Sequence, residues 1–493
     1  MPLVGAATSA MRSLFGSRPV VIPGNAPLIV ATGLGLITRA MPVAASAFPL
    51  GDGALFLTMA SDLRAAGFVA PLMSSYNGGI PFAYPPVGIY LLALWPGDLF
   101  VAERVLPVLI STALIPAVWL LARSLVGRDA ANAAAFAFAF TPSGWALLGG
   151  DVPRGLWLLF ALLATWQTVE ACRRRTARAA VVPGLLAGFA CVTHPAAPPA
   201  MTVFLLAAWL LSGLSWRRTW PEIALIAGIA VVVSGIWVAY VGARYGLGTL
   251  VAAVTSHYTE PLVERLLAFG STDIGLDLIT GAALVGFVWL TAARQWLVPV
   301  LMVALLILPG SDLRVLVVPT AILVGVAWAR VVRPPMEALA RNAVTGLTIS
   351  AIALAFLAAT VAPLTSHPLH ALGAADRGVM AWVASNLPED ATFAVLTPRD
   401  DDAAAEWFPL LAGRRSITTY QGQEWVGRRE WTDPVQAAIS LRKCATLDCV
   451  RRSGAPYLYL VQGCCPVLAA SLPATAVLHS DGGVIVVRVR DGP

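Results

Sequence analysis

The stretch of residues 221–242 reads PEIALIAGIAVVVSGIWVAYVG and contains one charged residue, Glu222. A helix of roughly 20 apolar residues crosses a hydrocarbon core of about 30 Å, so this stretch predicts a membrane-spanning helix. Comparable stretches recur from Pro23 to Pro363. Across the chain 58% of the residues are hydrophobic and 12% are charged, with a mean hydropathy of +0.76. Soluble domains are about 45–50% apolar and about 25% charged, so lipid is expected to surround most of this chain.

The repeated apolar stretches predict a polytopic α-helical membrane protein. Residues 1–24 lack a continuous apolar run followed by a small-residue cleavage site, so the first helix is expected to be retained. We expect eleven spans, which would place the two ends of the chain on opposite sides of the membrane. The spans are predicted at residues 24–46, 102–122, 130–148, 155–172, 179–194, 198–214, 221–242, 274–293, 296–309, 313–329 and 343–363.

The distribution of arginine predicts the orientation. Short loops such as residues 173–178 and 330–341 are rich in arginine and fall on alternate connections, which the positive-inside rule assigns to the cytoplasm. The long loops at residues 47–101 and 244–273 are then outside. The net charge of +6 does not indicate a nucleic-acid partner, because the arginines sit at helix ends and form no single stripe. We therefore expect a multi-pass membrane protein that is surrounded by membrane lipids and has its arginine-rich loops in the cytoplasm.

The first outside loop, residues 47–101, is more than a linker. Residues 55–68 have a helical spacing of apolar and polar side chains that predicts a short amphipathic helix in the membrane interface. A Pro/Gly/aromatic stretch, Tyr76-Asn-Gly-Gly-Ile-Pro-Phe-Ala-Tyr-Pro-Pro86, follows it. Non-helical backbone at membrane depth is tolerated where it is buried in protein or lines a cavity. The apolar face of the helix comprises Leu55, Met59, Leu63 and Phe68, and the polar face comprises Thr58, Ser61, Asp62 and Arg64.

The C-terminal part of the chain has a different pattern. Residues 1–23 are expected to be a cytoplasmic segment, residues 24–366 the membrane domain, and residues 367–493 an extracytoplasmic α/β domain. Within the last region, residues 484–487 and 475–479 predict a hairpin through Asp481-Gly-Gly483. The other predicted elements are helices at residues 376–386 and 402–411 and strands at residues 392–396, 416–420 and 457–461.

Four of the six cysteines, Cys444, Cys449, Cys464 and Cys465, lie in this C-terminal region. An extracytoplasmic location is oxidising, which favours one or two disulfides whose pairing the sequence leaves open. A zinc site is the alternative, although adjacent cysteines fit tetrahedral CxxC spacing poorly.

Two aspartates are candidates for acid–base chemistry. Asp52, in Gly51-Asp-Gly53, stands at the outer end of the first helix, where reduced solvent would make its carboxylate a better proton acceptor. A turn aspartate is the alternative. Asp151, in Gly150-Asp-Val-Pro-Arg154, is a second outside carboxylate, and it can also act as a helix N-cap.

Several basic residues at the predicted outer surface are candidates for binding an anion. Arg154 and Arg314 each begin a helix at its outer end, against both the helix dipole and the positive-inside rule, so a phosphate would suit them. Pairing with Asp151 or Asp312 is the alternative. Arg39, Arg104 and His194 are further candidates for binding the anion. The alternative for the two arginines is snorkelling to the membrane surface, and the alternative for His194 is a structural hydrogen bond.

Common nucleotide and metal motifs do not occur in a suitable context. The sequence has no P-loop, GxSxG, Rossmann fingerprint, HExxH or His/Cys ligand spacing, and it contains five histidines. A dedicated metal cage is therefore not predicted, and a divalent cation stays a candidate cofactor without an assigned site.

Taken together, the motifs resemble those of the GT-C membrane glycosyltransferases, the group that includes aminoarabinose transferase and protein O-mannosyltransferase. The resemblance covers about residues 25–363. It rests on Gly51-Asp-Gly53, the interfacial helix, Asn77-Gly-Gly-Ile-Pro-Phe-Ala-Tyr-Pro-Pro86, Glu103-Arg104, Arg154, Thr193-His-Pro195 and Arg314 ahead of Pro319.

The resemblance implies a transferase with a polyprenyl-phosphate sugar donor and an extracytoplasmic acceptor, which is a glycan, a lipid or a protein. It implies that Asp52 is catalytic and that Asp151 assists. The departure from metal-dependent members is that Gly53 and Ala54, not an acidic residue, follow Asp52. The residues expected at the donor phosphate are Arg314, Arg154, His194 and Arg104, and those expected at the substrate are Arg39, Tyr84, Asn77, Glu406 and Trp407.

Two other functions fit a polytopic protein with arginines at membrane depth. A lipid or sugar transporter or flippase would usually show inverted repeats, and no convincing repeat is found. A non-catalytic assembly protein whose C-terminal region binds a partner is the other alternative.

Overall fold

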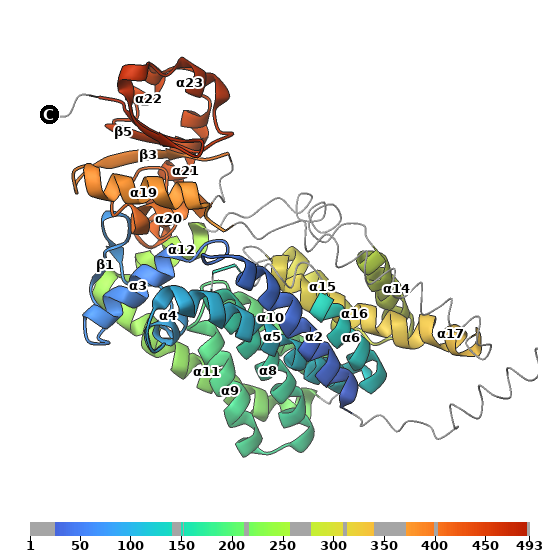
Figure 1. Ribbon diagram of the computed structural model, residues 1–493. Coiled ribbons are helices and arrows are strands. Elements are labelled where there is room, and N and C mark those ends of the chain that lie inside the picture. The colour runs from blue at the N-terminus through green and yellow to red at the C-terminus, as the bar shows by residue number, and fades with distance from the viewer. Residues whose placement is uncertain are drawn as a thin grey trace, which may run out of the picture.

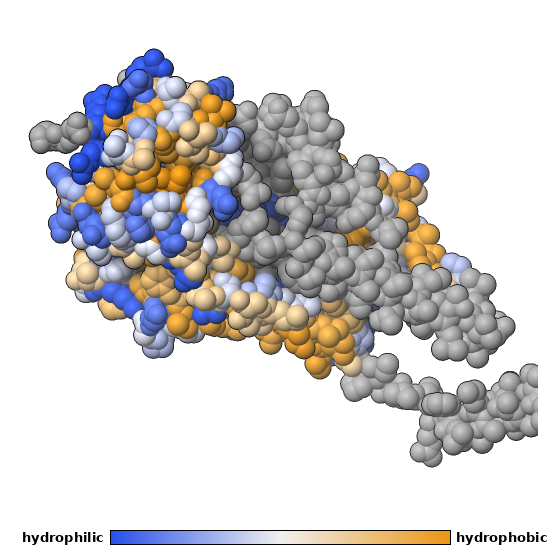
Figure 2. Space-filling model, turned by 45° about the horizontal axis from the view of Figure 1, so that its top comes forward, coloured by the Kyte–Doolittle hydropathy of each residue, from blue (hydrophilic) through white to orange (hydrophobic). Residues whose placement is uncertain are grey.

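A computed structural model describes residues 25–140, 149–150, 152–211, 216–256, 278–308, 313–339, 371–398 and 403–490. Its larger part is a bundle of helices, and the C-terminal segment, residues 371–490, lies at one end of this bundle (Figure 1). Figure 2 shows hydrophilic residues along the edges of the C-terminal segment with hydrophobic residues between them, and hydrophobic residues over parts of the helical bundle. This division follows the change of composition along the sequence.

The bundle is built around helix α5 (Leu99–Val126), which packs against α2 (Ala26–Ala45), α6 (Arg128–Phe140) and α8 (Val152–Arg174). Within the described residues five helices are long and apolar enough to cross a membrane: Ala26–Ala45, Leu99–Val126, Val152–Arg174, Arg217–Tyr245 and Arg314–Glu337. The fourth of these spans lies in α11 (Trp216–Tyr245), and the fifth includes α16 (Val317–Ala327) and most of α17 (Arg333–Leu339). The other described helices of the bundle are α9 (Ala177–Cys191), α10 (Ala197–Leu211), α12 (Leu247–Ser256), α14 (Leu278–Ala292) and α15 (Leu297–Ile307).

Most of the predicted spans coincide with helices of the bundle. Residues 343–363, the last predicted span, lie outside the described residues. Helix α12 was not predicted, because its residues fall in a stretch that the sequence analysis assigned to a loop.

Small residues allow the central helices to approach closely. Helix α6 buries Ala130, Ala131, Ala134 and Ala135, and α16 packs against it. A Cβ at Gly325 of α16 would overlap the carbonyl oxygen of Ala130, so only glycine fits at this crossing. Membrane helices commonly associate through such small-residue contacts, because lipid offers no hydrophobic drive for packing.

The predicted cytoplasmic loops gather at one end of the bundle. Arg333 pairs with Asp129 at 2.9 Å, and Arg128 donates to the side chain of Asn25 at 3.2 Å. Arg173 donates to the carbonyl of Ser124 at 2.7 Å. The first loop and the C-terminal segment lie at the other end (Figure 1).

The first loop begins with helix α3 (Ala54–Ala65), which differs from the predicted amphipathic helix. Leu55 and Met59 are buried as expected, but Thr58 on the predicted polar face is buried too. Helix α20 (Ala403–Leu411) of the C-terminal segment packs on α3, and residues 54–60 of α3 are buried. Phe68, expected on the buried apolar face, is 43% exposed. The rest of the loop comprises β1 (Met73–Ser74), the 3-10 turn Tyr76–Gly78, β2 (Ile80–Pro81) and α4 (Pro86–Ala93).

The C-terminal segment contains a five-stranded sheet of order β4-β3-β5-β7-β6. Strands β4, β3 and β5 are parallel, and β7 pairs antiparallel with both β5 and β6. The predicted strand at residues 392–396 matches β3, but the one at residues 416–420 is reduced to a two-residue β4. The strands are β3 (Thr392–Leu396), β4 (Arg415–Ser416), β5 (Tyr457–Leu460), β6 (Val477–Asp481) and β7 (Val484–Arg488).

The predicted hairpin at the end of the segment is confirmed. Its turn residues Gly482 and Gly483 have φ of 53° and 84°, the positive values that a two-residue hairpin loop requires. Two predicted helices match α19 (Ala374–Asn386) and α20 (Ala403–Leu411), whereas α21 (Arg428–Arg442), α22 (Leu447–Arg451) and α23 (Pro466–Ser471) were not predicted.

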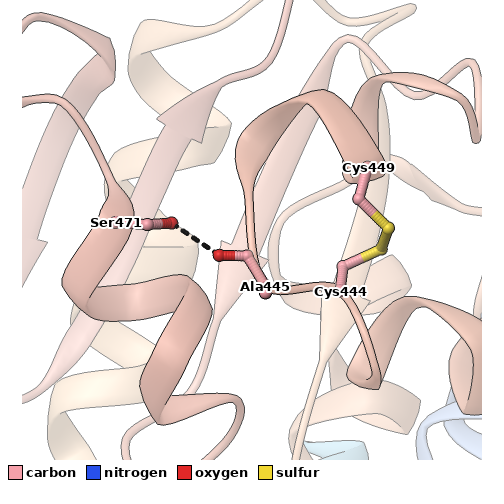
Figure 3. Close-up of a disulfide and its surroundings, with 4 residues drawn as sticks. All are labelled: Cys444, Ala445, Cys449 and Ser471. Atoms are coloured by element: carbon pink, nitrogen blue, oxygen red, sulfur yellow. Dashed lines mark hydrogen bonds between the residues drawn. A yellow bond between two sulfur atoms is a disulfide. The ribbon is translucent and has the colours of Figure 1, made fainter.

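The cysteines of this segment form one disulfide, Cys444–Cys449, between the end of α21 and α22 (Figure 3). Ser471 of α23 donates a hydrogen bond to the carbonyl of Ala445 at 2.9 Å and holds the same loop. Cys464 and Cys465 are not disulfide-bonded. The pKa of Cys465 is lowered by its hydrogen bond with Cys464 and by the nearby Arg442.

Candidate functional site

The turn Gly51-Asp52-Gly53 is held against the residues that precede α8. The amide of Gly150 donates to the carbonyl of Leu50 at 2.7 Å, which joins the two segments. A Cβ at Gly150 would overlap the carbonyl oxygen of Asp52, so this approach requires glycine. Asp52 is thereby placed beside the start of α8. Asp151, the second predicted carboxylate, lies outside the described residues.

Asp52 faces Arg154 in the first turn of α8. The carboxylate Oδ2 and guanidinium Nη2 are 4.0 Å apart, and the two side chains are 27% and 19% exposed. This separation exceeds the roughly 2.7–2.9 Å of a direct charge-assisted hydrogen bond. A cation at a helix N-terminus is unfavourable with respect to the helix dipole, and the carboxylate of Asp52 offsets that penalty. A partly exposed pair of opposite charges therefore stands at this end of the bundle.

Glu103, part of the Glu103-Arg104 motif, is a further carboxylate beside the turn. Its side chain is 1% exposed. A Cβ at Gly53 would come within 2.7 Å of Glu103 Oε1, and one at Gly150 within 2.9 Å. Glu103 therefore lies against both segments that present Asp52 and Arg154. The signal in the sequence was an acidic residue near the start of an apolar helix, where ionisable residues are usually functional.

The C-terminal segment contributes residues to the same region. Trp407 of α20 is fully buried and donates from its indole nitrogen to the carbonyl of Gly51 at 2.8 Å. Tyr76 of the first loop donates to the backbone carbonyl of Glu406 at 2.8 Å. Burial first, and then Glu406 and Glu424, raise the pKa of Tyr76 well above its ordinary value, so the phenol stays protonated. The predicted residues Glu406 and Trp407 are thus brought to the acidic turn.

Glu424 was not predicted, although it follows Glu406 in the same segment. Burial raises its pKa to about 7. It lies in the 3-10 turn Gln423–Trp425, which packs against α12 and α21. The negative charges of Glu406, Glu424 and Asp52 each contribute to raising the pKa of Tyr76.

Aromatic rings connect His194 to the first loop. The ring centroid of His194 is 6.2 Å from that of Tyr84 and 6.3 Å from that of Trp157. Tyr84 in turn lies 5.6 Å from Trp425. The backbone amide of Ala196 donates to His194 Nδ1 at 3.1 Å, which places the proton of the neutral imidazole on Nε2. His194 is therefore oriented by its own loop, as the structural alternative had suggested.

Two of the predicted site residues, Arg39 and Arg104, have contacts that hold the fold. Arg39 is fully buried and donates to Ser111 Oγ at 2.8 Å and to the carbonyls of Ala139 and Phe138 at 2.9 and 3.2 Å. Arg104 donates to the carbonyls of Val43 and Ser46 at 2.9 and 2.6 Å, where α2 ends. These contacts favour structural roles for both arginines, because a helix C-terminus is where a cation is stabilised.

Asn77, expected at the substrate, joins the first loop to the C-terminal segment. Its amide donates to the carbonyl of Ser416 at 3.1 Å and accepts from the amide of the same residue at 2.7 Å. Asn77 has φ of 49°, a left-handed conformation that asparagine tolerates better than most residues. Its geometry favours a docking role. Arg314 lies in the 3-10 turn Leu313–Leu316 directly before α16 and is partly buried.

The part of the chain that the structure describes does not form a site for a divalent cation. Among the described residues no three His, Cys, Asp or Glu side chains come together in a metal-binding arrangement. The carboxylate of Asp52 faces a guanidinium.

The overall arrangement matches solved structures of membrane transferases. Archaeal oligosaccharyltransferase AglB from Archaeoglobus fulgidus, solved with an inhibitory peptide and a dolichol-phosphate, aligns with a TM-score of 0.61 at 13% identity over 89% of this chain and 69% of that chain. The chain has the GT-C fold. ArnT from Cupriavidus metallidurans bound to undecaprenyl phosphate shares this fold with a TM-score of 0.57 at 15% identity, over 95% of this chain and 99% of that chain.

The apo form of the same ArnT aligns with a TM-score of 0.57 at 17% identity, over 94% of this chain and 98% of that chain. No family model matches the sequence, and no curated protein matches it. At these identities the GT-C fold is common to the three proteins, while the chemistry must be argued from this chain's own residues.

Proposed function

We propose that the protein is a membrane glycosyltransferase that moves a sugar from a polyprenyl-phosphate donor to an extracytoplasmic acceptor. The observation that carries this proposal is the partly exposed Asp52–Arg154 pair, which combines a proton acceptor with a phosphate-binding donor at one end of a GT-C fold. ArnT bound to undecaprenyl phosphate and AglB with dolichol-phosphate support the class of donor.

In the proposed reaction, Asp52 takes the proton of an acceptor hydroxyl as its oxygen attacks the anomeric carbon of the sugar. The bond between that carbon and the lipid phosphate breaks, and the phosphate leaves with the bonding electron pair. A single displacement inverts the anomeric centre. The 27% exposure of the Asp52 side chain makes it reachable by an acceptor.

Arg154 is proposed to bind the donor phosphate, with Arg314 and His194 as further donors of hydrogen bonds. Asp151 is proposed to assist from the residue before α8. Tyr84, Glu406 and the neighbouring Glu424 are proposed to surround the sugar or acceptor. Arg39, Arg104 and Asn77 are not included, because their hydrogen bonds hold the fold.

The site is proposed to face the extracytoplasmic side of a bacterial cytoplasmic membrane, with the acceptor a glycan, a lipid or a protein. The arginine-rich loops gather at the opposite end of the bundle, where Arg333 pairs with Asp129 and Arg173 meets α5. That end is the cytoplasmic one by the positive-inside rule.

The test is Asp52→Asn, assayed by single-turnover transfer from labelled polyprenyl-phosphate sugars. The amide keeps the size and turn preference of aspartate but cannot act as the base, so transfer should fall by about 10²–10⁴-fold with donor binding retained. Asp98→Asn is the matched control, because Asp98 N-caps α5 in this region of the chain and asparagine also caps helices.

Full transfer by folded Asp52→Asn protein would overturn the general-base role. A wild-type protein that binds a polyprenyl phosphate and carries it across a proteoliposome membrane without transferring the sugar would instead be a flippase. A protein that binds no polyprenyl phosphate would support the assembly function.

A further inference from the structure

The turn that presents Asp52 has little intrinsic rigidity. Gly51 and Gly53 flank the aspartate with φ of 70° and 143°. Glycine adopts such values at no steric cost, but it also visits many other conformations. The position of the Asp52 carboxylate therefore depends on contacts supplied from outside the turn.

Those contacts come from two sides. On the bundle side, Gly150 donates to the carbonyl of Leu50 at 2.7 Å. On the C-terminal side, Leu50 forms an isolated antiparallel bridge with Ala371. The indole of Trp407 donates to the carbonyl of Gly51 at 2.8 Å, the residue directly before Asp52.

Trp407 is itself held firmly. It is fully buried, and its ring lies 4.6 Å from that of Phe48 and 6.0 Å from that of Phe100. Two hydrogen bonds fix helix α20, which carries Trp407. The Tyr76 hydroxyl donates to the carbonyl of Glu406, and the Thr419 hydroxyl donates to the carbonyl of Ala405 at 2.6 Å. A rigid donor of this kind can fix a flexible acceptor.

We propose that Trp407 is a positioning residue that fixes the Gly51-Asp52-Gly53 turn, so that the C-terminal segment completes the catalytic site. The inference rests on the proposed role of Asp52. It replaces the expectation that Trp407 contacts the substrate, because a fully buried indole is not available to one.

The test removes the indole N–H and keeps the ring. Trp407 is replaced by its benzothiophene isostere, which has sulfur in place of N–H, and in parallel by Phe as Trp407→Phe. We expect kcat to fall about 10–100-fold with the KM for donor nearly unchanged, because a misplacement of about 1 Å near the chemistry has effects of this size. Trp382→Phe, in α19 on the ring of His479, is the control and should change neither value.

A second measurement separates positioning from general destabilisation. In an Asp52→Asn background the isostere should cause no further loss of transfer, because its effect acts through Asp52. Hydrogen exchange of the peptide covering residues 48–56 should become faster in the isostere protein and stay unchanged in Trp382→Phe.

The outcomes separate the two proposals. An unchanged kcat and unchanged exchange in the isostere protein, with Asp52→Asn inactive, would overturn the positioning role alone. An equal loss of transfer with and without the Asp52 carboxylate would also overturn it, since that result marks a structural defect. Full activity of Asp52→Asn would overturn the general-base role first, whatever the isostere does.

Discussion

Two arginines on the membrane helices, Arg39 and Arg154, illustrate two uses of the same side chain. Arg39 of α2 is fully buried and gives its donors to a serine hydroxyl and to helix carbonyls. Arg154 of α8 is 19% exposed and stands 4.0 Å from the carboxylate of Asp52. An arginine whose N–H groups donate to buried groups of the fold has a structural role, whereas a partly exposed arginine beside a carboxylate is suited to bind a ligand.

The largest effect is expected from removing the structural arginine. Arg39→Met withdraws four hydrogen bonds from α2, α5 and α6. Since each bond from a charged donor contributes about 1.5–3 kcal/mol, we expect a loss of at least about 3 kcal/mol of stability. A much lower thermal midpoint in detergent, with unchanged transfer per folded molecule, would support this use. Loss of donor binding in protein of normal stability would contradict it.

A smaller effect, on ligand affinity and not on stability, is expected at Arg154. Arg154→Gln removes a partly exposed charge, so the thermal midpoint should change little. The affinity for a polyprenyl phosphate should fall about 10–100-fold, which corresponds to about 1.5–3 kcal/mol for a charge-assisted hydrogen bond. Arg173→Gln at the opposite end of the bundle is the control. Equal donor affinities in Arg154→Gln and wild type would move Arg154 to the structural group.

The smallest effect is expected at Glu424, a buried carboxylate of the C-terminal segment. Burial raises the pKa of Glu424 from an ordinary 4.5 to about 7 in the folded protein, so the folded state binds more protons than the unfolded state between these values. Stability should therefore fall as pH rises from about 4.5 through 7 and then level off.

Glu424→Gln should remove this pH dependence and give a higher thermal midpoint than wild type at pH 8, with the two proteins converging near pH 5. The pKa difference corresponds to at most about 3 kcal/mol, which water penetration reduces. Glu389→Gln, an exposed carboxylate of the same segment, should behave as wild type. Parallel pH profiles for wild type and Glu424→Gln would contradict the assignment.

Much of the candidate site was predictable as individual positions. Asp52 and Arg154 stood out in the sequence because each is a charged residue next to a long apolar stretch. Arg39 stood out for the same reason and has another role, because the sequence does not show that the carbonyls of Phe138 and Ala139 lie within its reach. Glu424 was missed because its burial depends in part on α12, an element more than 160 residues before it in the sequence.

The sequence by itself determined that this chain is a helical membrane protein, because the length and polarity of its apolar stretches are local properties matched to the thickness of a bilayer. It also determined strand β3 and the hairpin of β6 and β7, whose alternation and glycine turn are local. The contact of Trp407 with Gly51, the link from Asn77 to β4 and the burial of Thr58 on the predicted polar face of α3 depend on the tertiary structure. These contacts link residues more than 300 positions apart in the sequence. They stabilise the fold only when the C-terminal segment has docked on the bundle.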